Sequence, residues 1–130
     1  MSPTIDELLP LSKALKAESN DLNKTIAAIS DKLAALNLGI EVWITSEFAP
    51  EYDVGFGKVS EAVPGGEKKW QLACRMGHNT HAYAEPLLSA SRDLRIEGLK
   101  LVPTIVATLQ DEAQERIRIM QEAKKQAAEL

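Results

Sequence analysis

Cys74, His78, His81 and Glu85 are the side chains of this sequence whose types and spacing could bind a metal ion together. Thiolate and imidazole are ligands that zinc prefers, and a turn in this short segment would bring them around one ion. Cys74 also alternates with apolar residues in the pattern of a strand, which predicts that its thiol points into a core as a small hydrophobic group. The two histidines then lie on a polar loop. We therefore expect neither a metal nor another cofactor.

Three arginines form the second candidate site. Arg75, Arg92 and Arg95 could gather near the start of a helix, whose first backbone amides favour anions. Asp93 and Glu97 interleave with these arginines, however, and ion pairs along an ordinary helix surface explain the same pattern. An anion site is therefore the weaker of the two interpretations.

Residues for catalysis are sparse. Both histidines fall in one loop, and no serine, histidine and acid follow one another in an order typical of nucleophilic enzymes. The segment Gly55-Phe56-Gly57-Lys58 has the composition of a phosphate-binding loop, but it lies inside a strand pattern and does not open a helix. The sequence favours a protein that is not an enzyme.

Composition and charge narrow the classes of partner. The chain has 130 residues, of which 45% are apolar and 26% charged, and its net charge of −4 is spread evenly. With no basic face, nucleic acid is not an expected partner. The longest uncharged run, 101–110, is about half of what a membrane span requires. One cysteine and the acidic residues Asp6 and Glu7 near the N-terminus predict a cytoplasmic protein without a signal peptide.

Apolar spacing predicts a long first helix over residues 4–37. Thr4 and Glu7 have the spacing of a capping box, and Gly39 suits the left-handed position that follows a helix. Between them apolar residues recur at steps of three or four, apart from a gap filled by Glu18. They are Leu8, Leu11, Leu15, Leu22, Ile26, Ile29, Leu33 and Leu36.

The middle of the chain predicts three strands, over 40–48, 52–62 and 67–75, which short turns join into an antiparallel meander. A loop follows at 76–85, and 86–128 is predicted to be helical with a break or kink near 98–103, at Gly98 and Pro103. The expected fold is therefore a single α+β domain over 1–130: a long N-terminal helix, a three-stranded antiparallel β-meander and a long C-terminal helix.

The predicted helices are longer than the predicted strands can cover. A strand of about eight residues spans roughly 27 Å, whereas a helix of about 32 residues spans roughly 48 Å. If the two helices run parallel, each leaves apolar surface bare at one end, which a second subunit would cover. If they run antiparallel, they cover one another as a stalk. The sequence leaves both open and favours a homo-oligomer, with a dimer as the simplest case.

The function that we expect is a non-enzymatic interaction or assembly module, such as an adaptor, a chaperone-like protein or a structural subunit. It would act on another protein or another copy through its long helices and the outer face of its sheet. The interface residues that we predict are Trp43, Ile105, Leu109, Ile117 and Met120. Core packing explains the helix positions more simply, and Trp43 could instead cover the sheet by itself. The alternative is a protein, or an enzyme, that binds a small molecule, anion or metal through residues 74–85 and the nearby arginines.

Overall fold

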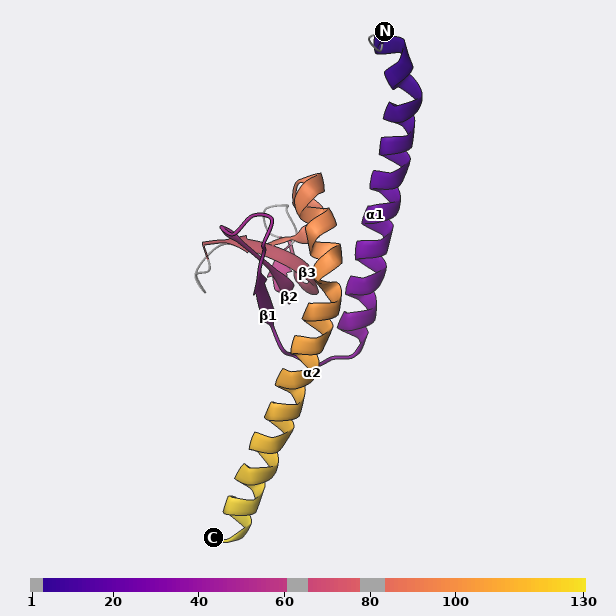
Figure 1. Ribbon diagram of the computed structural model, residues 1–130. Helices are drawn as coiled ribbons and strands as arrows, with labels where there is room; N and C mark the ends of the chain where they lie inside the picture. Colours follow the sequence, from indigo (N-terminus) through magenta and orange to yellow (C-terminus); the bar gives the residue numbers. More distant parts are fainter. Residues whose placement is uncertain (1–3, 61–65, 78–83) are drawn as a thin grey trace.

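The computed structural model describes residues 4–60, 66–77 and 84–130, which form two long helices and one antiparallel sheet (Figure 1). The helices are α1 (Leu9–Ala35), preceded by the short 3₁₀ helix η1 (Ile5–Leu8), and α2 (Arg92–Ala128), preceded by η2 (Leu87–Ser89). The strands are β1 (Val42–Thr45), β2 (Tyr52–Ser60), β3 (Lys68–Met76) and β4 (Ala84–Pro86). They lie side by side in chain order. The α+β class is confirmed.

The prediction of three strands is wrong by one. Residues 84–86, which we expected in a loop and a helix start, form β4 and pair with Ala73–Arg75 of β3. A strand of three residues is too short to display an alternation, so its sequence carries no strand signal. Residues 61, 62 and 78–83, which belong to the predicted second strand and loop, lie outside the described residues.

The beginnings of both helices differ from the prediction. Thr4 makes no side-chain cap, and its carbonyl instead accepts a backbone hydrogen bond from Glu7 at 3.2 Å, so the expected capping box is absent. α1 then begins beside Pro10, whose missing amide hydrogen is not needed in a first turn. α2 begins at Arg92 and not at 86, with the Ser91 hydroxyl accepting from the Leu94 amide at 3.3 Å.

α2 continues without a break through Gly98 and Pro103, where we expected an interruption. Gly98 has a packing reason. A Cβ atom there would lie 2.6 Å from the Cδ2 atom of Leu87, which is fully buried under the helix. The glycine therefore brings α2 close to η2, and packing compensates for its poor helix propensity.

Both helices lie on one face of the sheet, α1 against β3 and α2 against β1 and β2 (Figure 1). Alternate residues of the strands supply the core between them, and the rings of Phe56 and Trp70 stack with centroids 5.6 Å apart. The core residues are Ile26, Leu33, Ile40, Val42, Val54, Phe56, Leu72, Cys74, Leu87, Leu94, Ile105 and Leu109.

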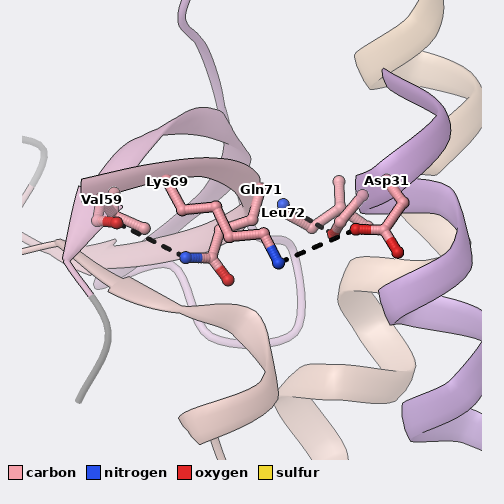
Figure 2. Close-up of polar contacts among 6 residues, drawn as sticks. Asp31, Val59, Lys69, Gln71 and Leu72 are labelled. Atoms are coloured by element: carbon pink, nitrogen blue, oxygen red, sulfur yellow. Dashed lines mark hydrogen bonds and ion pairs between the residues drawn. The ribbon is translucent and has the colours of Figure 1, made fainter. Parts of the chain in front are cut away.

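α1 also satisfies a backbone group of β3 that no strand reaches. β4 pairs only with residues 73–75, so the amide of Leu72 lies beyond its end. The hydroxyl of Ser30, itself buried, accepts a hydrogen bond from that amide at 3.0 Å. Nearby, Lys69 reaches Asp31 at 3.8 Å on the surface (Figure 2). The hydrogen bond between Ser30 and Leu72 fixes how α1 lies along β3, because leaving the buried Leu72 amide unpaired would be costly.

The two helices run parallel and extend past the sheet at opposite ends (Figure 1). In α1 the side chains before Leu22 are exposed apart from that of Ser19, which is partly buried, and the first fully buried side chain is that of Ile26. In α2 every side chain after Ala113 is exposed. We call residues 5–21 the α1 overhang and residues 114–128 the α2 overhang. Each projects about 20 Å or more at 1.5 Å per residue. Of the two arrangements that the sequence left open, the chain therefore adopts the one that leaves both helix ends bare.

The close approach of β1 to β2 yields a test of the packing. A Cβ atom on Gly55 would lie 1.8 Å from the carbonyl oxygen of Val42, whereas one on Gly57 would meet mainly the side chains of Glu41 and Trp43, at 3.1 and 3.2 Å. We expect Gly55→Ala to lower the free energy of unfolding by about 3 kcal/mol or more, and Gly57→Ala by about 1 kcal/mol. Urea denaturation of both variants measures this, and equal losses would contradict the described pairing of β1 with β2.

Candidate interaction surfaces

The α1 overhang carries a bare apolar stripe. Leu8, Leu11 and Leu15 follow at helical spacing and are 53%, 61% and 49% exposed. The stripe continues the core positions of α1, which begin at Leu22 with partial burial. Sequence spacing contained this signal, yet these leucines were missing from the interface residues that we predicted. An apolar stripe that runs beyond its core is typical of an interaction surface.

The α2 overhang carries a second bare stripe. Ile117 and Met120 are 50% and 57% exposed and follow Ala113, the last partly buried apolar residue of the core face. Both were predicted as interface residues, and both side chains are exposed on the single chain, where another molecule could contact them. Their role at an interface stays a prediction.

The other predicted interface residues lie elsewhere. Ile105 and Leu109 are buried in the core of the chain itself, where they hold α2 on the sheet. Trp43 is partly buried on the outer face of the sheet, opposite the helices. Reaching a partner through Ile105 or Leu109 would require α2 to leave the sheet.

An apolar groove runs between the two helices at the base of the α1 overhang. It encloses about 370 Å³. Its apolar lining includes Leu15 and Leu22 of α1 and Ile96 of α2, and charged side chains of both signs also line it. Its lining consists of Leu15, Glu18, Ser19, Asp21, Leu22, Thr25, Arg92, Ile96 and Leu99. The groove joins the bare stripe of α1 to exposed apolar surface of α2.

The outer face of the sheet is covered by its own side chains. Asp53 is buried and accepts from the Nε atom of Arg75 at 3.0 Å and from the hydroxyl of Thr45 at 3.3 Å. The guanidinium of Arg75 lies 4.4 Å from the ring centroid of Trp43, which in turn lies over Gly57. Trp43 thus has contacts inside the chain, and sequence reasoning missed them because Arg75 and Asp53 lie on different strands.

The three predicted anion-site arginines do not come together. Arg75 is held by Asp53 on the outer face of the sheet. Arg92 lines the groove on the helix side. Arg95 donates from a terminal nitrogen to the side-chain oxygen of Asn23 on α1, and its buried Nε atom has no partner among the described residues. Arg75 therefore lies apart from Arg92 and Arg95, which are about one turn apart on α2, and Arg95 serves the contact between the helices.

Cys74 and Glu85 sit opposite each other on β3 and β4 and line a second pocket of about 390 Å³. Burial, and secondarily the charge of Glu85, raise the pKa of the Cys74 thiol to about 11. His78 and His81 lie outside the described residues. Within the described ranges, no group of three or more histidine, cysteine or acidic side chains is placed to hold a metal ion.

Comparisons with family models, with curated proteins and with solved structures found no match to this chain. Between residues 4 and 130, apart from the two gaps, neither helix has a stretch long and apolar enough to cross a membrane.

The raised pKa of Cys74 leads to a prediction about its reactivity. The thiolate is the reactive form, so at pH 8 the native thiol should react with iodoacetamide roughly a hundredfold more slowly than the unfolded chain. Because the native pKa lies above the unfolded value, this group favours the folded state fully below about pH 8.5. That contribution should be lost as the pH rises toward 11. Equal rates of alkylation in native and urea-unfolded protein would contradict the burial of this thiol.

Proposed function

We propose that this protein is a non-enzymatic assembly module that associates with a second copy of itself through its helix overhangs. The observation that carries the proposal is the pair of bare apolar stripes, one on each overhang, at opposite ends of the chain. Exposed apolar surface of this extent is costly in water and favours association.

A second copy suits this surface better than an unrelated partner. The two overhangs have similar lengths and similar apolar stripes, so one copy offers both halves of a helix pair to another. Most oligomers of soluble proteins are built from identical chains with closed symmetry. If the module serves as an adaptor, chaperone-like protein or structural subunit, the further protein that it contacts would bind to the dimer.

The test is the mass of the protein in solution. We expect a dimer by light scattering that persists through a hundredfold dilution, and a monomer for Ile117→Glu, because a charge would replace an apolar contact at the interface. Gln114→Glu is the matched control, since it places the same charge on an exposed position beside the stripe. Its mass should equal that of the wild type.

Thermal unfolding of the same variants separates interface from core. Ile117 lies beyond the last buried residue of α2, so Ile117→Glu should still unfold cooperatively as a monomer. Leu109→Glu would not be informative, because Leu109 belongs to the core. A wild type that is monomeric at all concentrations would overturn the proposal.

The alternative function is binding of a small molecule, anion or metal near residues 74–85. The pocket lined by Cys74, Glu85 and Tyr52 is the observation that favours it. Such a protein should gain melting temperature in the presence of zinc or phosphate by the same amount at every protein concentration. An assembly module should instead change its melting temperature with dilution and ignore both additives.

A further inference from the structure

We propose that the α1 overhang of one copy pairs antiparallel with the α2 overhang of the other, around a two-fold axis, in a closed dimer. This inference rests on the proposed function, namely that the overhangs associate, and it adds which overhang meets which and in what direction.

The internal arrangement sets the geometry. Asn23 of α1 contacts Arg95 of α2, so the two parallel helices are level there, and each extends beyond the other at one end (Figure 1). A half-turn about an axis perpendicular to the helices exchanges the two ends of the molecule. The α2 overhang of the second copy then lies where the α1 overhang of the first is bare, and the reverse holds at the other end. The dimer then contains two such helix pairs, and all four overhangs are covered.

The apolar stripes match in this arrangement. With the two tips at the same end of each helix pair, Leu11 and Leu15 come level with Met120 and Ile117 of the second copy. The groove between α1 and α2 begins at Leu15 and continues past Leu22. In the dimer this groove receives the part of α2 of the second copy around Ala113 and Ile117. The apolar surface that α2 of the second copy contacts is therefore continuous from the groove to the leucine stripe.

Charges beside the stripes favour the same direction. With about 3.6 residues per turn, Glu7 and Glu18 fall on one flank of the leucine stripe. On α2, Arg116 falls on the flank that meets it in an antiparallel pair, level with Glu18, and Lys124 follows Ile117 and Met120 toward the end that carries Glu7. Among the described residues none of these four makes an ion pair within its own chain. Opposite charges would therefore meet at both ends of each helix pair.

The other pairings leave apolar surface bare. Pairing of two α2 overhangs with each other would leave Leu8, Leu11 and Leu15 exposed on both copies. A parallel, head-to-tail pairing would generate an open chain of subunits, with one overhang left bare at each end. The closed antiparallel pairing has neither defect.

Charge reversal tests the pairing in the full-length protein. The acid-reversed variant is Glu7→Lys/Glu18→Lys, and the base-reversed variant is Arg116→Glu/Lys124→Glu; all four positions are exposed. Alone, each variant brings like charges together at both ends of the dimer. We expect its dimer dissociation constant to rise roughly tenfold or more. An equimolar mixture places opposite charges at both ends, so it should form a heterodimer with nearly the wild-type dissociation constant.

The measurement is sedimentation equilibrium of each variant alone and of the mixture, at low and at high salt, because screening should shrink the differences. Recovery in the mixture excludes misfolding as the cause of weakening. An acid-reversed variant that dimerises as tightly as the wild type would remove α1 from the interface and overturn the pairing. A mixture no tighter than its components, or a wild type that forms chains longer than a dimer, would do the same. In those cases, loss of association in Ile117→Glu would still support the proposed function. A monomeric wild type would overturn both the proposed function and the antiparallel pairing.

Discussion

The length of the sheet constrains the rest of this structure. Its longest strands have nine residues, so they span about 30 Å. α2 has 37 residues and spans roughly 55 Å. A sheet of that size can bury only part of either helix, and the short chain between α1 and β1 fixes where α1 must end relative to it. Because the helices run parallel on one face, the unburied parts project from opposite ends, and neither helix can shield the other.

Side chains of the chain itself complete two parts of the sheet that strand pairing and the helix layer leave open. Ser30 supplies the acceptor that Leu72 lacks beyond the end of β4, so a side chain of α1 replaces strand pairing there. On the outer face, Gly55 lets β1 approach closely, and the ion pair of Arg75 with Asp53 under Trp43 shields the backbone from water. A partly buried ion pair is a costly way to cover a surface unless its charges are well matched. Here the guanidinium of Arg75 contacts both a carboxylate and an aromatic ring. The apolar stripes that remain exposed therefore lie on the helix overhangs.

Sequence spacing predicted the two helices and the antiparallel strands, because periods of 3.6 and 2 residues persist over long segments at α1, β3 and α2. It failed where the deciding contact is distant in sequence or short. β4 has three residues and no period, and the close contact between Leu87 of η2 and Gly98 of α2 joins two segments that no local pattern relates. The pairing of Arg75 with Asp53 needs the register of β2 against β3, which no local pattern contains. For the interaction surfaces, the pattern identified Ile117 and Met120 but also Ile105 and Leu109. Apolar spacing alone does not distinguish a buried stretch of a helix from its bare continuation.

The bare overhangs also connect association to helix formation. An isolated helix of fewer than about 12 residues is marginal in water, and most helical stability in proteins comes from packing of an apolar face. The α1 and α2 overhangs each gain cooperativity from the core at one end only, so their outer turns depend on whatever covers their stripes. In the proposed antiparallel pairing, each overhang would lie beside an overhang of the partner with both free tips at the same end. The positive N-terminal end of α1 would then lie beside the negative C-terminal end of α2 of the partner. In the proposed dimer, covering the stripes would therefore also stabilise the outer turns of both helices.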